Sequence, residues 1–170
     1  MTENASSPTT VAYFLEPGYI FVATRPTVIS SVLGSAVSVC LYDRKRKLGG
    51  MNQFQLPEVR DREKATARYG NAATLALVRM MEENGCTVRS MEAQIIGGAF
   101  NRSVSEEDIG RTNVGVARRV LGRKGIRIVS EDVGGFKGRK VIFNTGVNEV
   151  AVMKVDRLRT GDWHPYEDDR

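Results

Sequence analysis

The sequence predicts an α+β fold: a single domain with a mixed β core and helices packed on its outside. Two observations support this prediction. A segment with helical periodicity, closed by a glycine and followed by an apolar strand-like segment, occurs twice, and the other apolar segments are rich in β-branched residues. The 170 residues, 41% apolar and 26% charged, suit one domain with one core.

The first predicted helix spans residues 69–84. We expect Asn71 to cap its first turn and Gly85 to end it in the left-handed conformation. One face repeats at helical spacing and is expected to be buried. It consists of Ala73, Leu77, Met80 and Met81.

The second predicted helix runs from about residue 106 to residue 124. Ser105 and Asp108 have the spacing of a partial capping box, and Gly125 is expected to close the helix. Its buried stripe consists of Val116, Ala117, Val120 and Leu121.

Strands are predicted where β-branched and apolar residues gather between turn signals. The expected extended segments are 19–24, 28–42, 47–56, 91–98, 126–133, 138–144 and 149–155. The last two are expected to form a hairpin through residues 145–148, and the basic cluster 44–47 is expected to be a turn.

The ends of the chain are polar. We expect residues 1–13 to be a flexible tail, residues 14–155 to form the domain, and residues 156–170 to be a polar tail in which Trp163 begins the only apolar element. No run of about 18 apolar residues is present, and the N-terminus has no signal-peptide pattern. These features predict a cytoplasmic protein without membrane insertion.

The composition favours neither a metal site nor a nucleic-acid partner. Cys40, Cys86 and the single histidine, His164, do not have metal-ligand spacing, and nothing in the sequence implies a cofactor. The net charge of +5 is spread along the chain without a nucleic-acid-binding motif.

Three glycine pairs stand near expected strand ends: Gly49–Gly50, Gly97–Gly98 and Gly134–Gly135. Glycine permits unusual backbone angles and the close approach of another backbone. Two interpretations stay open at this point, namely three unrelated tight strand ends or the lining of one cleft.

A series of segments, in this order, resembles the CheD family of chemoreceptor glutamine deamidases. They are Leu15–Gly18, Val32–Asp43, Gly49–Pro57, Arg68–Asn71, Ile95–Ala99, Ile109–Asn113 and Glu131–Lys140. The order holds from about residue 14 to residue 155. The resemblance implies a layered α/β sandwich and a cysteine hydrolase in which a thiolate attacks a receptor glutamine amide and water releases glutamate.

The resemblance also shows where this chain departs from the family. Ala36 stands at the family's nucleophilic cysteine, Gln53 at its histidine and Ser30 at a threonine. Alanine has no lone pair, and a glutamine amide takes no proton near neutral pH. By the same resemblance, the candidates for a binding cleft are Ser35, Asn52, Gly97, Gly98, Gly134 and Gly135.

Three hypotheses follow. The first is a catalytically deficient protein that binds chemoreceptors or a CheC-type phosphatase, the partners that the resemblance implies. The second is a receptor deamidase whose nucleophile has been changed in this sequence. The third, for which no reaction can be named, is an unrelated enzyme using Glu131, Asp132 and Arg139, which are more typical of a strand-end ion pair.

Substitute nucleophiles are also weighed. On a continuous strand Ser35 faces away from Ala36, whereas Ser38 and Cys40 share its face roughly 6.6 and 13 Å further along. A rewired pair of Cys40 and His164 is the remaining alternative, and packing is the simpler interpretation of Cys40.

Overall fold

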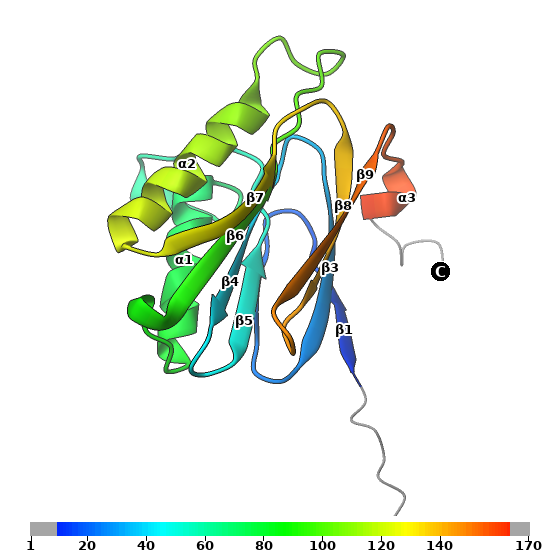
Figure 1. Cartoon of the computed structure of the whole chain (residues 1–170). Coiled ribbons are helices and arrows are strands. Elements are labelled where there is room, and N and C mark those ends of the chain that lie inside the picture. Colours follow the sequence, from blue (N-terminus) through cyan, green and yellow to red (C-terminus); the bar gives the residue numbers. More distant parts are fainter. Residues whose placement is uncertain (1–9, 164–170) are drawn as a thin grey trace, which may run out of the picture.

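A computed structural model of the chain describes residues 10–163. These residues form three layers: a four-stranded sheet, a five-stranded sheet, and two helices that cover the outer face of the five-stranded sheet (Figure 1). This arrangement confirms the predicted α+β domain with a mixed β core and outer helices.

The strands are β1 (Val11–Phe14), β2 (Ile20–Ala23), β3 (Thr27–Leu33), β4 (Val37–Asp43), β5 (Leu48–Asn52), β6 (Met91–Gly97), β7 (Arg127–Val133), β8 (Gly138–Asn144) and β9 (Glu149–Val155). The helices are α1 (Gly70–Glu83), α2 (Ile109–Lys124) and the short α3 (Thr160–Trp163), with 3-10 turns at Arg62–Lys64 and Val88–Ser90. None of these helices is long and apolar enough to cross a membrane.

The four-stranded sheet has the order β1-β3-β8-β9, and the five-stranded sheet has the order β2-β5-β4-β6-β7. The pairs β1–β3 and β6–β7 are parallel and the others are antiparallel. Consecutive strands β3 and β4 therefore belong to different sheets, and the short connection between them crosses from one layer to the other.

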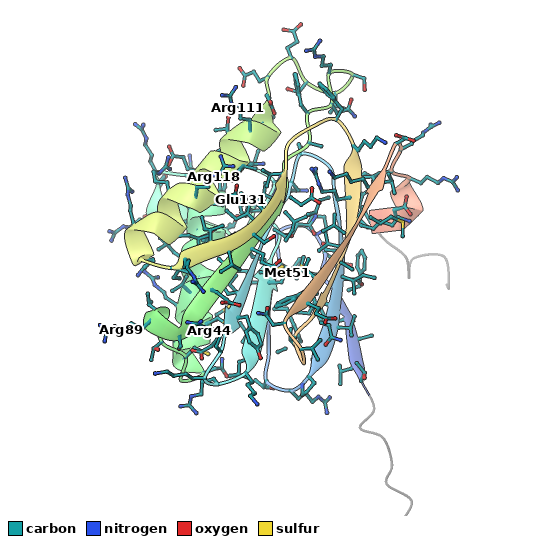
Figure 2. All side chains as sticks on the ribbon, viewed as in Figure 1. Arg44, Met51, Arg89, Arg111, Arg118 and Glu131 are labelled. Carbon is teal, nitrogen blue, oxygen red and sulfur yellow. The ribbon has the colours of Figure 1, made fainter. Side chains whose placement is uncertain are left out.

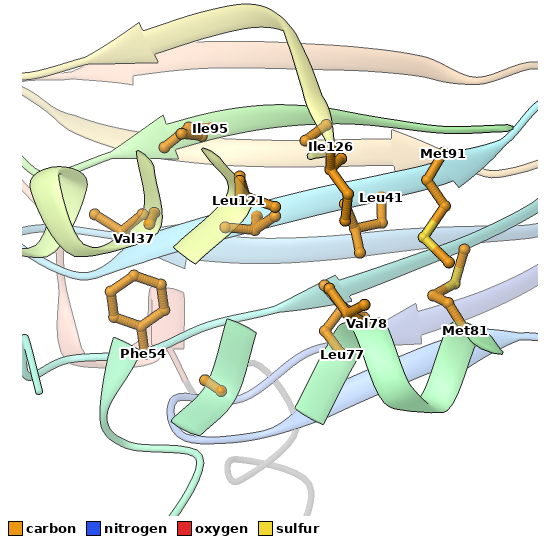
Figure 3. Close-up of a cluster of buried hydrophobic side chains, with 14 of the residues drawn as sticks. Val37, Leu41, Phe54, Leu77, Val78, Met81, Met91, Ile95, Leu121 and Ile126 are labelled. Atoms are coloured by element: carbon orange, nitrogen blue, oxygen red, sulfur yellow. The ribbon is translucent and has the colours of Figure 1, made fainter. Parts of the chain in front are cut away.

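Two apolar clusters hold the layers together. One lies between the helices and the five-stranded sheet and includes Phe54, Leu77 and Leu121 (Figure 3). The other lies between the two sheets and includes Met51 and Phe143. Each of these five side chains is fully buried, and such burial contributes roughly 1.5–3 kcal/mol per large apolar side chain.

The structure corrects the expected single extended segment at 28–42. It contains two strands, β3 and β4, separated by the turn Gly34–Ala36. The β-branched pattern continues through both strands because each is buried, and local pattern does not show that one pairs in each sheet. Ser35 and Ala36 therefore lie in a turn and not on a strand.

The ends of the domain also differ from expectation. Residues 11–13, assigned to a tail, belong to β1, because their backbone pairs in parallel with residues 27–29 of β3. In the expected C-terminal tail, residues 160–163 form α3, which contacts β3.

The two long helices start differently from the prediction. α1 begins at Gly70 without a side-chain cap, because Asn71 instead exchanges two hydrogen bonds with the backbone of Val59. α2 begins at Ile109, later than expected, with the carboxylate of Asp108 accepting from the Arg111 N–H at 3.0 Å. Gly125 closes α2 in the left-handed region, as predicted.

Candidate functional site

The turn Gly34–Ala36 is held in place by the glycines at the end of β6. The carbonyl of Ala36 accepts a hydrogen bond from the Gly98 N–H at 2.9 Å, and the carbonyl of Gly34 accepts from the Ala99 N–H at 3.0 Å. Gly97 has a φ of +110°, and a Cβ at this position would collide with the Ala36 carbonyl oxygen. Glycine at 97 therefore allows β6 to approach position 36 this closely.

Gln53 lies between the two sheets with a fully buried side chain. Its Nε2 donates to the carbonyl of Val32 at 2.8 Å, and its Oε1 accepts from the Ser31 hydroxyl at 2.6 Å. The Ser31 Oγ also lies 2.9 Å from the carbonyl of Leu15, so its one proton serves either acceptor. Both polar atoms of the Gln53 side-chain amide are hydrogen-bonded within the protein.

Asn113 of α2 connects the turn Gly34–Ala36 to the segment that follows Gln53. Its Nδ2 donates to the carbonyl of Ser35 and to the carbonyl of Gln55, both at 3.0 Å. The Asn113 side chain is fully buried, and its Oδ1 has no hydrogen-bond partner among residues 10–163. The helix thereby sets the spacing between the turn that carries Ala36 and the segment that carries Gln53.

A cavity of about 340 Å³ opens over these two positions. Its walls are the turn Gly34–Ala36 and the residues Pro17, Gln53, Gln55 and Trp163. A larger cavity of about 790 Å³ shares Gly34, Ser35 and Trp163 with it and extends toward the loop after β6. Of the sequence-predicted residues, the structure thus brings Ser35, Ala36 and Gln53 to one cavity.

Other predicted residues lie elsewhere. On β3, Ser31 faces Gln53, so the neighbouring Ser30 points to the opposite face of the sheet. Asn52 is fully buried in the five-stranded sheet, where its Oδ1 accepts from the Val39 N–H at 2.8 Å, and it does not line the cavity.

The glycine pairs divide into two groups. Gly134 donates its N–H to the Gly97 carbonyl, and the Gly135 carbonyl accepts from the Phe100 N–H. The pairs Gly97–Gly98 and Gly134–Gly135 therefore lie together, next to the turn that carries Ala36. Neither pair lines the two cavities. Gly49–Gly50 serves packing instead, since Cβ atoms there would press on side chains of β8, the residue after it, β2 and α1.

Both cysteine thiols have raised pKa values. Cys40 is buried between the sheets, and burial raises its thiol pKa far above the ordinary value. Burial, together with the negative charge of Asp43, raises the pKa of the Cys86 thiol to about 11. His164 lies outside the described residues, so its position relative to Cys40 stays untested.

The acidic residues proposed for an unrelated enzyme form ion pairs. Arg118 of α2 makes two hydrogen bonds of 2.8 Å to the carboxylate of Glu131 on β7 (Figure 2). These bonds raise the pKa of Arg118 and lower that of Glu131. The buried guanidinium of Arg139 bonds to Asp132 at 3.1 Å and to the Gly134 carbonyl at 2.9 Å. These contacts are those of the expected strand-end ion pair.

Three residues of the site were not predicted from the sequence: Ser31, Asn113 and Trp163. Alternation on a correctly bounded β3 would have distinguished Ser31 from Ser30. Asn113 lay within a segment already matched to the family, but its contacts are long-range, 58 and 78 residues away in sequence. Trp163 belonged to the segment singled out as apolar, and its place over the site depends on tertiary structure.

Fold and site together define a layered α+β domain with a cavity that is lined by Ala36 and Gln53. The family described as CheD, chemotactic sensory transduction, matches residues 55–154. The chain belongs to the CheD family. The match begins two residues after Gln53, so it does not include positions 36 and 53.

Curated relatives agree along most of the chain. A probable chemoreceptor glutamine deamidase CheD of Sulfurimonas denitrificans is 37% identical over 147 residues, covering 85% of this chain and 94% of the relative. One from Rhodospirillum rubrum is 36% identical over 88% of this chain and 85% of its own length. CheD 1 of Anaeromyxobacter dehalogenans is 41% identical over 77% of each chain.

Proposed function

We propose that this CheD-family protein is catalytically deficient and acts in the cytoplasm by binding chemoreceptors or a CheC-type phosphatase. Its relatives are named as chemoreceptor glutamine deamidases, which makes a receptor the first partner to test. The CheC-type phosphatase follows from the family resemblance.

The chemistry of positions 36 and 53 carries this proposal. Ala36 presents a methyl group where the family mechanism needs a thiolate, and Gln53 cannot act as a base. In a characterised protease, loss of the nucleophile alone lowers turnover roughly a millionfold, and loss of its partner as well adds little. By that mechanism this chain would be essentially inactive.

The binding half of the proposal is supported by the frame around those positions. Asn113 and Gly98 still hold the turn, and two cavities still adjoin it. The buried amide of Gln53 replaces a titratable group without leaving a polar atom of its own unsatisfied. Such a site keeps a shape that a partner can recognise.

The alternative is a receptor deamidase whose nucleophile has been replaced in this sequence. The same frame fits it equally well. The second departure, at Gln53, is the argument against a deliberate change, since replacing the nucleophile alone would trap a complex. Sequencing the encoding gene decides this point, because a cysteine codon at position 36 would establish the enzyme.

The direct test is incubation with a receptor signalling domain that carries glutamine, followed by intact mass spectrometry for conversion of amide to acid. The chain as given, the Ala36→Cys variant and the Ala36→Cys, Gln53→His double variant are compared, and binding of each to the receptor and to the phosphatase is measured in parallel.

We expect no deamidation by the parent protein and deamidation by the Ala36→Cys, Gln53→His double variant. The parent protein and both variants should bind a partner. The single variant separates the nucleophile from its base. Deamidation by the chain as given would overturn the proposal. Failure to bind either class of partner at high micromolar concentration would also overturn it.

A further inference from the structure

The end of the described chain lies across the site. Trp163, the only tryptophan of the protein, lines the cavity over Ala36 and Gln53 and also the larger cavity beside it. The aromatic side chain therefore stands where the two cavities meet, next to Gly34 and Ser35.

Three contacts along β8 and the loop before it bring Trp163 to this place. The Asp156 carboxylate lies 3.3 Å from the Lys137 ammonium. The Leu158 side chain packs directly on Gly138, where a Cβ would collide with it. The Asp162 carboxylate pairs with the Lys140 ammonium at 2.7 Å and accepts from the Arg159 N–H at 2.7 Å.

These contacts are suited to a reversible attachment. The lysine and aspartate pairs are at least partly exposed, and exposed pairs contribute only about 0–1 kcal/mol each. The hydrogen bonds from Lys140 and Arg159 lower the pKa of Asp162 below its ordinary value. No strand pairs with residues 156–163, and the segment adds no layer to the fold.

We propose that residues 156–163 form an intramolecular strap that places the indole of Trp163 over the mouth of the site, and that a partner's side chain enters only after the strap is displaced. The proposal rests on the binding function proposed above, because it describes how access to that same site is regulated. The indole then acts as an internal competitor for the partner.

An open approach remains beside the strap. Phe136 and Val104 line the larger cavity and are 70% and 80% exposed, and Arg102 lies over the Phe136 ring. A partner that engages this outer cavity first would reach the strap from its free side and compete with Trp163 for the inner cavity.

A thiol placed at position 36 reports on the mouth of the site. In the Ala36→Cys variant, the rate of alkylation by iodoacetamide is measured by mass spectrometry with and without Trp163→Ala. Because reaction requires the open state, its rate follows the open fraction, and we expect Trp163→Ala to raise it about tenfold. Asp162→Asn, which weakens one attachment, should give a smaller increase.

The controls separate access from other effects. Phe136→Ala removes an aromatic side chain that lines the larger cavity but not the inner one, so it should leave the rate unchanged. The chain with Ala36 gives the background of the buried thiols of Cys40 and Cys86. Rates are compared at the high-pH plateau, where a change in the pKa of the new thiol no longer contributes.

The chain without a new cysteine gives a second measurement. As Trp163 is the sole tryptophan, acrylamide quenching of its fluorescence reports on this side chain alone. Asp162→Asn, and saturation with a bound partner, should both increase quenching. The strap proposal would be overturned by equal alkylation rates with and without Trp163→Ala. It would also be overturned if Asp162→Asn left the acrylamide quenching of Trp163 unchanged.

Failure of the strap and failure of the binding function are distinguishable. Alkylation and quenching need no partner, so a positive result there supports the strap even if neither partner class binds. Where a partner does bind, Trp163→Ala should tighten its affinity by about the same factor as it raises the alkylation rate. If the parent protein and the Trp163→Ala variant bind the partner with equal affinity, Trp163 does not compete with the partner.

Discussion

The two ends of β4 show opposite solutions to burying polar groups. At its C-terminal end, the fully buried Asp43 carboxylate accepts four hydrogen bonds, of 2.9 Å from the N–H groups of Lys45 and Arg46, 3.0 Å from the Thr87 N–H and 2.6 Å from the Ser90 hydroxyl. Just before its N-terminal end, Ala36 has no polar side-chain atom, and its neighbour Gln53 is neutral.

The difference separates an end that holds a charged group in many hydrogen bonds from an end that opens on a cavity. Asp43 joins the β4–β5 turn to the connection between α1 and β6, so its charge stabilises the fold. The Ala36 end contains a cavity instead, and its polar groups are held by neutral hydrogen bonds. Because hydrogen bonds to charged groups contribute about twice as much as neutral ones, the two ends should respond differently to substitution.

The largest effect is expected for Asp43→Ala. Four donors would lose their acceptor, among them the buried Ser90 hydroxyl, and we expect the free energy of unfolding to fall by about 3–4 kcal/mol. Urea denaturation measures the change. Asp156→Ala, at a side chain that is 88% exposed, is the matched control and should change it by less than about 0.5 kcal/mol. Equal losses for the two variants would remove the contrast between the ends of β4.

A smaller effect is expected for Gln53→Met at the other end. The side chains have similar volume, but the Val32 carbonyl loses its donor, while the Ser31 hydroxyl can still donate to Leu15. We expect a loss of about 1–2 kcal/mol in the same denaturation experiment. A loss as large as that of Asp43→Ala would show that the Ala36 end is equally structural.

A paired substitution on β3 should sharpen the definition of the site. Ser31→Ala removes the hydroxyl that reaches Gln53 and Leu15 and should cost about 1 kcal/mol. Ser30→Ala acts on the outer face and should change stability by less than about 0.5 kcal/mol. In the Ala36→Cys, Gln53→His background, the Ser31 change should also reduce deamidation more than the Ser30 change. The reverse order would place Ser30 at the site.

The smallest effect is expected in how the contribution of Asp43 to the free energy of unfolding changes at acidic pH. Burial alone would raise the pKa of Asp43, but the hydrogen bonds from Ser90, Arg46, Thr87 and Lys45 outweigh it and lower the pKa below the ordinary value. Its stabilisation is therefore fully present above the unfolded pKa of about 3.9 and is lost as the pH falls through the lower folded value.

The stability difference between the parent and Asp43→Asn should accordingly be constant from about pH 5 upward and shrink below about pH 4. Urea denaturation across this range measures it, and Gln53→Met, which removes no ionisable group, supplies the matched comparison. A difference that grows on acidification would contradict the sign of the shift.

Much of the fold followed from local patterns. Helices α1 and α2 were placed within a few residues, because apolar spacing and terminal glycines such as Gly85 and Gly125 act over one turn. The hairpin of β8 and β9 was also predicted, since its strands are close in sequence. Caps were less predictable, because Asn71 has a long-range partner that competes with the helix end.

The sequence by itself determined the family, helices α1 and α2, and the chemistry of Ala36 and Gln53, because an alanine methyl and a glutamine amide keep their chemistry wherever they fold. Tertiary structure alone decided that β3 and β4 enter different sheets, that Ser31 faces Gln53, and that Trp163 lines the cavity. These features depend on contacts between residues far apart in the chain, and the geometry of such contacts is set only when the layers pack.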